Sequence, residues 1–184
     1  MEGKGVREVV WISSDPRGME HCVVTREAGG WSLQGTIVRK FAEGASGITY
    51  RIETDNRWNT GKVLVEEQFR GENRELKISV NRGRWVIGDR EDPALRSCKD
   101  VDLEASPATN TLPIKRAAIK VGSRVELNAA WVRFPSLRVV PLRQSYERLS
   151  GRRYVYRSAS GFETRIETDG FGLVRRYGDY WTAE

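Results

Sequence analysis

"ITYRIETD", residues 48–55, alternates apolar and polar side chains. A period of two places Ile48, Tyr50 and Ile52 on one face of a β-strand and the polar residues on the other. Such a strand is typical of an antiparallel sheet that is buried on one side and solvated on the other. The segment therefore predicts a sheet with one apolar face.

The same alternation recurs along the chain, for example in "ELKISVN" at 75–81 and "FETRIETD" at 162–169. Between the alternating segments lie clusters of turn-forming residues, such as "EAGG" at 27–30 and "SASG" at 158–161. Together they predict roughly a dozen strands with connections of hairpin length. No segment predicts an amphipathic helix longer than two turns.

A five-residue segment occurs twice: "RIETD" stands at 51–55 and again at 165–169. Each copy ends an alternating strand and enters a turn that carries an aromatic residue, Trp58 or Phe171. We interpret this as a duplicated β-meander. The chain is then a single β domain over 1–184 with two similar halves, about 1–97 and 117–184, joined by a connector at 98–116.

A long sheet with one apolar face must cover that face, and this sequence offers few or no helices to do so. The sheet is therefore expected to curl on itself. We predict an all-β fold, a large antiparallel curled sheet or partly closed barrel. Its concave interior could hold an apolar or amphiphilic small molecule, with polar groups at the mouth.

The connector, "CKDVDLEASPATNTLPIKR" at 98–116, breaks the strand pattern. Pro107 and Pro113 lack N–H groups and push the residues before them toward extended geometry. We therefore expect the segment to cross between the halves rather than to pair with a strand. Its hydroxyl groups and the Asn110 amide can satisfy the unpaired backbone or line the rim of a pocket.

Three segments carry a resemblance to a known family: "DVDL" at 100–103, "TNTLPI" at 109–114 and "WVRFP" at 131–135. Together with their flanks, over nearly the whole chain, they resemble the bacterial family described as putative glycolipid-binding, formerly a domain of unknown function. The resemblance implies a large β-sheet like that of bacterial lipoprotein carriers. It also implies an amphiphilic ligand such as a glycolipid, and it brings no assigned catalytic or binding residue.

Ligand-binding candidates follow from side-chain chemistry. Trp131 and Arg133 share one strand face, where an indole could stack on a sugar ring and a guanidinium could bind its hydroxyls or a phosphate. Trp31, Tyr50 and Trp58 are further aromatic candidates, and Asn110 is the polar candidate from the connector. For each aromatic residue, burial in the core is the alternative.

An enzyme is the first alternative function, a hydrolase that uses His21 with Asp100 or Asp102. Cys98 could also act as a nucleophile with His21, although a buried inert thiol is the simpler interpretation. The chain has no Gly-x-Ser-x-Gly turn and no His-Glu-x-x-His or Cys/His metal pattern. We therefore assign no catalytic residue, no metal ligand and no cofactor, and we favour a binding protein over an enzyme.

The net charge of +6 suits an anionic partner. Single-stranded nucleic acid is the second alternative, because basic strands with aromatic residues can stack bases, but we do not favour it. A purely interacting scaffold is a third. No apolar run reaches the length of a signal peptide or a membrane span, so we expect a cytoplasmic protein; the oligomeric state stays open.

Overall fold

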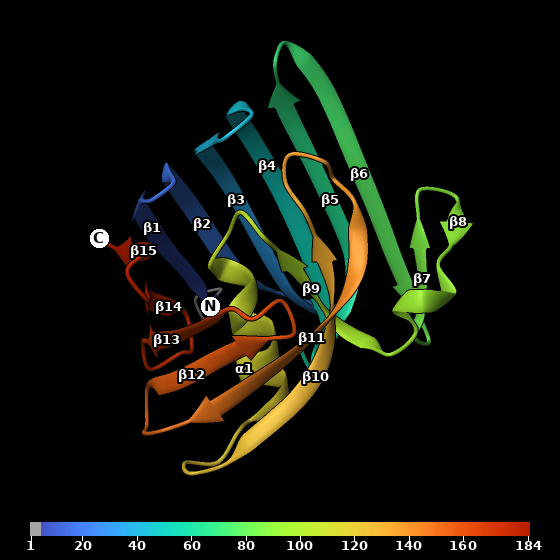
Figure 1. Cartoon of the computed structure of the whole chain (residues 1–184). Helices are drawn as coiled ribbons and strands as arrows, with labels where there is room; N and C mark the ends of the chain where they lie inside the picture. Colours follow the sequence, from blue (N-terminus) through green and yellow to red (C-terminus); the bar gives the residue numbers. More distant parts are fainter. Residues whose placement is uncertain (1–4) are drawn as a thin grey trace.

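The computed structural model describes residues 5–184 and shows one large, mostly antiparallel β-sheet with one short α-helix (Figure 1). The all-β prediction is confirmed. The strands are β1 (Val6–Ser14), β2 (Arg17–Glu27), β3 (Gly30–Phe41), β4 (Gly44–Asp55), β5 (Thr60–Phe69), β6 (Glu72–Asn81), β7 (Arg84–Ile87), β8 (Arg90–Glu91), β9 (Cys98–Leu103), β10 (Arg124–Val132), β11 (Val139–Arg148), β12 (Arg153–Ser158), β13 (Glu163–Thr168), β14 (Val174–Tyr177) and β15 (Trp181–Ala183). The helical elements are the 3-10 turns η1 (Pro93–Leu95) and η2 (Ala108–Asn110) and the helix α1 (Thr111–Ala117).

Two meanders are joined edge to edge within this sheet. Its strand order is β8-β7-β6-β5-β4-β3-β2-β1-β15-β14-β13-β12-β11-β10-β9. The first and last strands of the chain, β1 and β15, pair with each other, with Trp11 opposite Ala183. The sheet is therefore continuous although the connector separates its two halves in sequence.

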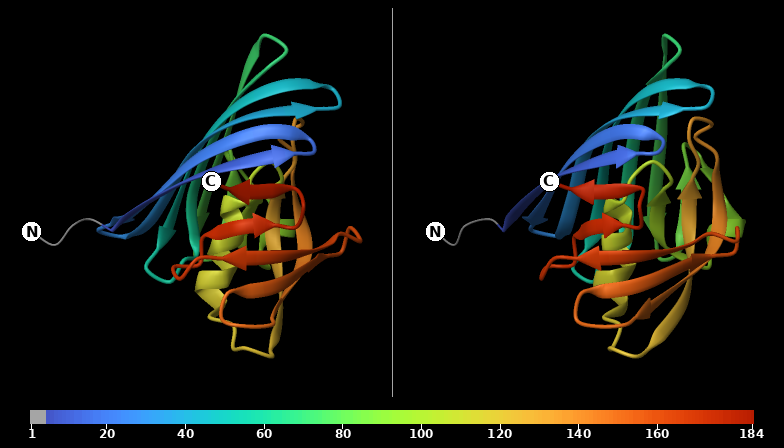
Figure 2. Two further views of the ribbon diagram at one scale, coloured as in Figure 1. Left: turned by 90° about the vertical axis from the view of Figure 1, so that its left-hand side faces the viewer. Right: turned by 60° about the vertical axis from the view of Figure 1, so that its left-hand side comes forward.

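The sheet curls strongly but does not close by strand pairing (Figure 1, Figure 2). Its end strand β9 turns inward and lies against β5, where the Val101 N–H donates a 3.0 Å hydrogen bond to Thr60 Oγ1. The predicted curled or partly closed sheet is confirmed. Curling lets the apolar face cover itself, as the scarcity of helices requires.

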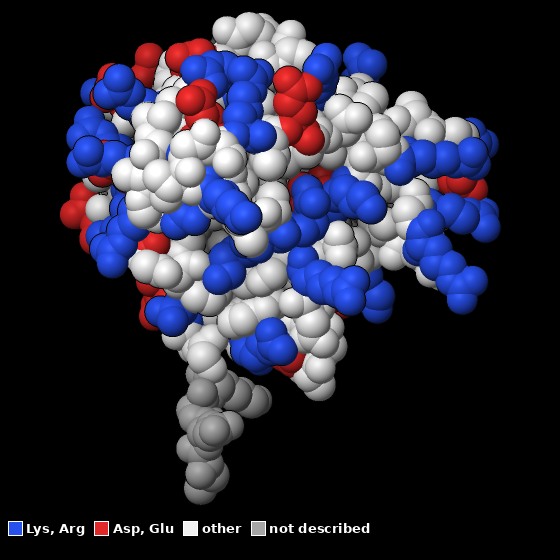
Figure 3. Space-filling view, turned by 90° about the horizontal axis from the view of Figure 1, so that it is seen from below, with Lys and Arg blue, Asp and Glu red and all other residues white. Residues whose placement is uncertain are grey.

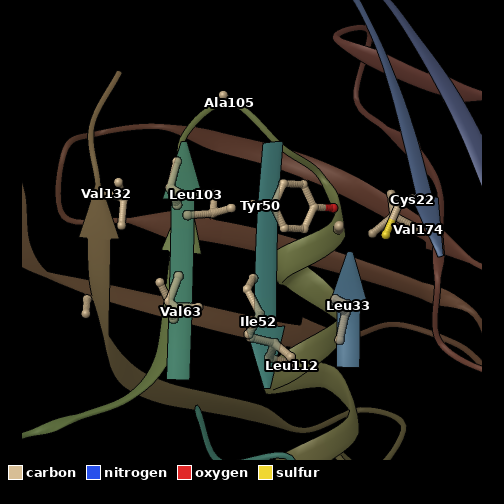
Figure 4. Packing of buried hydrophobic residues seen from close by; sticks show 14 of the residues in the cluster. Cys22, Leu33, Tyr50, Ile52, Val63, Leu103, Ala105, Leu112, Val132 and Val174 are labelled. Carbon is tan, nitrogen blue, oxygen red and sulfur yellow. The ribbon is translucent and has the colours of Figure 1, made fainter. Parts of the chain in front are cut away.

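Alternation within strands sorts the side chains as the sequence predicts. In β4, Ile48, Tyr50 and Ile52 are buried and Thr49 points outward. Figure 4 shows Tyr50 and Ile52 of this face together with residues of the connector, and Leu112 of α1 lies near Ile52. The core therefore lies between the sheet and the connector.

The connector is more ordered than the sequence suggests, and the expectation that it only crosses is wrong. Residues 98–103 form β9, which pairs in parallel with β10, and the segment then turns through η2 into α1 inside the curled sheet (Figure 2). Pro113 is the third residue of α1, where a missing N–H costs no intrahelical bond. Burial of Leu112, which is 0% exposed, stabilises a helix of only two turns.

The two RIETD copies adopt the same local geometry. Each contains a register shift, between Glu53 and Thr54 in one copy and between Glu167 and Thr168 in the other. The Asp that ends each copy accepts backbone N–H bonds from the turn that follows. The duplication of a meander stays a prediction that this likeness supports. In residues 5–184, no helix is long and apolar enough to cross a membrane.

Candidate functional site

One cavity of about 330 Å³ lies between the connector and the C-terminal strands. Asp102 of β9 and residues within 103–110 form one side of it, strands β10, β11, β12 and β14 with the loops at 160–162 and 180 form the other, and β3 and β15 contribute Arg39 and Trp181. Its lining is Pro16, Arg39, Asp102, Leu103, Glu104, Ser106, Pro107, Asn110, Trp131, Leu142, Tyr156, Ser158, Ser160, Phe162, Tyr177, Tyr180 and Trp181. We call it the Asp102 pocket.

Other hollows lie on the outer face of the sheet. One of about 400 Å³ is lined by side chains such as His21, Gln34 and Arg51, and one of about 540 Å³ by side chains such as Thr36 and Glu66. Both are larger than the Asp102 pocket, but they are also more open to solvent. Because ligand sites are enclosed, mostly apolar and furnished with a few polar groups, the Asp102 pocket is the better candidate.

Asp102 is the charged centre of this pocket. It stands opposite Trp131 in the parallel β9–β10 register, which turns both side chains toward the same face. Gln144 donates a hydrogen bond to Asp102 Oδ2, and Thr109 Oγ1 donates one of 3.3 Å to Oδ1. Burial raises the pKa of Asp102 to about 6, against the effect of these two bonds. The carboxyl group therefore titrates near neutral pH.

Asn110 and Ser106 hold the connector side of the pocket. Asn110 Oδ1 accepts a 2.8 Å hydrogen bond from the hydroxyl of Tyr146, and its Nδ2 donates 3.1 Å to the Pro107 carbonyl. Ser106 Oγ donates 2.7 Å to the buried carboxyl of Glu20 on β2. These bonds tie the connector to both halves of the sheet, so the pocket wall is preorganised.

Four aromatic side chains form the opposite wall. The Phe162 ring centroid lies 6.1 Å from those of Tyr156 and Tyr177 and 5.4 Å from that of Tyr180. Tyr156 lies in β12 and Tyr177 in β14, whereas Phe162 comes directly before β13 and Tyr180 lies in the turn between β14 and β15; the antiparallel pairing of β12, β13 and β14 brings them together. Burial raises the pKa of Tyr156 and of Tyr177, so both hydroxyls stay protonated as hydrogen-bond donors.

Arg39 is a largely buried cation at the edge of the pocket. Its Nη1 donates a 3.0 Å hydrogen bond to the Ala105 carbonyl, and its guanidinium lies 4.9 Å from the ring centroid of Trp181. Burial lowers its pKa, while Glu104 and Glu20 act in the opposite direction. Arg39 therefore joins β3, the connector and β15 at one point.

The structure places only two of the six predicted ligand residues, Asn110 and Trp131, in the lining of the Asp102 pocket. Arg133 is next to it, with its guanidinium 4.5 Å from the Trp131 ring centroid and its Nε 3.8 Å from Glu104 Oε1. Tyr50 lies in the core and donates a 2.5 Å hydrogen bond to Glu20. Two of the six candidates thus line the pocket and a third, Arg133, lies next to it.

Trp31 and Trp58 lie elsewhere, at the opposite end of the curled sheet. Their rings stack with centroids 4.8 Å apart, and Phe171 packs edge-on against both. Trp58 follows one RIETD copy and Phe171 follows the other, so the two turns meet at this end. These residues seal the core there, which was the alternative interpretation of the aromatic candidates.

The aromatic wall of residues 156–180 is absent from the sequence-based candidates. Its signal is the density of rings in this part of the chain, five Tyr or Phe between 154 and 180 outside the turn at 171. Which of them share a face depends on strand register, and the β13–β14 pairing contains a shift. Alternation within a single strand does not supply that information.

The residues of the hydrolase alternative are not brought together. His21 lies on the outer face, where its Nε2 is 2.7 Å from Glu8 Oε1, whereas Asp100 is buried and paired with Arg116. Cys98 is buried, and burial raises its pKa to about 11, so it is a thiol at neutral pH. Within residues 5–184, no group of His, Cys, Asp and Glu side chains could hold a metal ion.

Comparisons with known proteins agree with this fold. The chain is similar to a DUF1089 family protein from Pseudomonas aeruginosa whose crystal structure is known. The two are 27% identical, the match covers 90% of this chain and 91% of that one, and the TM-score is 0.81. A search of curated protein sequences found no match. The model of the family described as putative glycolipid-binding matches residues 8–183, and the chain belongs to this family.

Proposed function

We propose that the protein binds an amphiphilic small molecule, such as a glycolipid, whose hydroxyl-rich head enters the Asp102 pocket. The observation that carries this proposal is that a half-buried carboxylate and an aromatic wall line the same cavity. Family membership supports a binding role.

The polar side of the pocket suits ligand hydroxyl groups. A carboxylate offers about four acceptor positions, and the described side chains occupy two of those of Asp102. The Asn110 amide has two N–H groups, and one of them is bonded to Pro107. The connector side of the pocket therefore offers a ligand both hydrogen-bond acceptors, on Asp102, and a hydrogen-bond donor, on Asn110.

The opposite wall suits the apolar face of a sugar ring or the first part of an alkyl chain. Phe162, Tyr177 and Tyr180 present ring faces and edges, which bury apolar surface and orient a flat ligand. The two walls thus match the two kinds of surface that a glycoside presents.

The volume limits what can enter. Ligand pockets are commonly about 300–1,000 Å³, and this one of about 330 Å³ is at the lower end of that range. Because η2 and α1 fill much of the concave interior, we propose that the head group is enclosed and that long acyl chains extend past the mouth beside Tyr180, which is 40% exposed.

Native mass spectrometry of freshly purified protein tests this proposal. We expect a mass increase from a co-purified amphiphile, or after incubation with an octyl glycoside, and its loss in Asp102→Asn with Tyr177→Ala. Thr36→Ala, on the outer face, is the matched control and should bind as wild type does. Equal binding by the pocket variant, or no binding to any glycoside or lipid, would contradict the proposal.

Binding of a neutral glycoside should also depend on pH. The ionised carboxylate of Asp102 accepts hydroxyl hydrogen bonds, and it gains a proton as the pH falls through about 6. Affinity should therefore decrease below pH 6 in wild type and be nearly constant in Asp102→Asn.

A further inference from the structure

We propose that the loop tips at 118–123 and 149–152 form a docking site for an anionic lipid bilayer. We call these two loops the basic tip. The site is separate from the Asp102 pocket, since none of its residues lines that pocket. Their position is shown by Figure 1, where the loop before β10 is the lowest part of the molecule.

Two aliphatic side chains project from the basic tip. Val121 is 58% exposed and Leu149 is 46% exposed. The loops that carry them are adjacent, because the Gly122 N–H donates 2.8 Å to the Arg148 carbonyl and the Arg148 N–H donates 2.9 Å to the Ser123 carbonyl. Two exposed apolar groups are thus held next to each other at a projecting end.

Arg148 fixes the shape of the tip. Its guanidinium donates to three backbone carbonyls, those of Ile119 at 2.8 Å, Ser150 at 3.1 Å and Gly151 at 2.6 Å. One side chain therefore bridges both loops. Little conformational entropy is lost when such a preorganised tip meets a surface.

The apolar groups stand among cations. Lys120, Arg124, Arg152 and Arg153 are exposed around them. Arg124 is paired with Glu126 and Arg153 with Glu167, whereas Lys120 and Arg152 form no ion pair within residues 5–184. The view from below shows many Lys and Arg side chains over this end, with fewer Asp and Glu side chains among them (Figure 3). This arrangement complements the negative surface potential of an anionic bilayer, which basic residues approach and apolar side chains enter.

Nucleic acid is the other anionic partner to consider. Recognition of single strands uses aromatic platforms on which bases stack. The exposed groups of the tip are aliphatic, and the rings of Trp31, Trp58 and Phe171 pack against one another. The chemistry of the tip therefore favours lipid.

Co-sedimentation with vesicles tests this inference, using the full chain. Wild type should bind vesicles of equal parts phosphatidylglycerol and phosphatidylcholine, bind pure phosphatidylcholine at least about tenfold more weakly, and lose affinity as salt is added. Val121→Asp with Leu149→Asp should weaken binding about tenfold. Met19→Asp with Val38→Asp makes the same charge change at exposed apolar positions of the outer face, 52% and 63% exposed, and should retain wild-type binding.

A second test variant with its own control examines the cations of the basic tip. Lys120→Gln with Arg152→Gln should weaken binding about tenfold, whereas Arg17→Gln with Arg90→Gln, exposed elsewhere, should have little effect. Equal loss in test and control variants would overturn the proposal. So would binding to a single-stranded oligonucleotide without binding to vesicles.

These vesicles contain no glycolipid, so their binding is independent of the proposed function. The Val121→Asp, Leu149→Asp variant should bind an octyl glycoside as wild type does. Loss of vesicle binding with glycoside binding intact would separate the two sites. Loss of both, with unchanged thermal unfolding, would contradict their separation.

Discussion

Glu20 is a single residue whose charge is set by its buried surroundings. Its side chain is fully buried, and burial raises its pKa to about 8, although Tyr50 and Ser106 donate hydrogen bonds to it. At neutral pH it is therefore a neutral acid. Its Oε2 has no hydrogen-bond partner among residues 5–184.

Glu20→Gln tests this state through the pH dependence of stability. The folded chain keeps the Glu20 proton up to about pH 8, whereas the unfolded chain releases it near 4.5. Between these values the folded state binds more protons, so the free energy of unfolding falls as pH rises from about 4.5 to about 8. The glutamine variant should lack this fall, which we expect to be roughly a few kcal/mol. Parallel pH profiles of the two proteins in urea denaturation would contradict the assignment.

Gly35 is a position where the packing excludes any side chain. A Cβ there would lie 2.4 Å from ring atoms of Tyr50, which is buried and held by Glu20. Gly35→Ala should therefore destabilise the protein by about 1–3 kcal/mol. Gly47→Ala, on the neighbouring strand β4 with no atom within 4 Å of the added Cβ, is the control and should change stability little. Equal effects of the two substitutions on the urea midpoint would contradict this packing.

Residue-level prediction from sequence succeeds where one strand's alternation is enough. The inward positions of Ile48, Tyr50 and Ile52 follow from the sequence alone. The role of Asp102 does not, because its environment depends on Trp131, Gln144 and Thr109 from other parts of the chain. Trp31 and Trp58 show the same limit, since the sequence alone does not distinguish a tryptophan that closes the core from one that lines a pocket.

The connector is the part of the chain whose structure differs most from the prediction made from the sequence. Turn-forming residues and two prolines at 98–116 predict a crossing loop, yet tertiary burial overrides local propensity and gives β9, η2 and α1. The helix has too few turns to be stable by itself. Its apolar residues must therefore be stabilised by the sheet around them.

Leu112→Ala measures how much α1 contributes as an inner core. Leu112 is 0% exposed, and removing a buried leucine side chain typically costs about 2–5 kcal/mol. Leu64→Ala, on the outer face of β5 where the side chain is half-buried, is matched in chemistry and should cost less than half as much. Equal urea midpoints for the two variants would show that α1 is only a linker.

The molecule as a whole is one sheet, although its sequence reads as two similar halves. Pairing of β1 with β15 and the hydrogen bond from Val101 to Thr60 connect the N-terminal and C-terminal strands at two places. The connector adds bonds to both halves, from Ser106 to Glu20 and from Tyr146 to Asn110. Buried residues of both halves and of the connector form one core cluster.

Unfolding should therefore be a single cooperative transition. Far-ultraviolet circular dichroism and tryptophan fluorescence should give the same urea midpoint, because tryptophans lie in both halves and the strands of both form one sheet. Separate midpoints would mean that the halves are independent domains, which contradicts the predicted single domain.

The central claim, that the Asp102 pocket receives the head of an amphiphile, can be tested most directly with the six tryptophan indole N–H signals. Trp131 and Trp181 line the pocket. Trp31 and Trp58 lie at the opposite end, and the indoles of Trp11 and Trp85 donate to the carbonyls of Val174 and Cys98 in the core.

In a titration with an octyl glycoside, followed by ¹H–¹⁵N correlation spectra with the signals assigned by Trp→Phe substitution, the indole signals of Trp131 and Trp181 should shift while those of Trp31 and Trp58 stay in place. Shifts confined to Trp31 and Trp58, or no shift at any concentration below micelle formation, would contradict the claim.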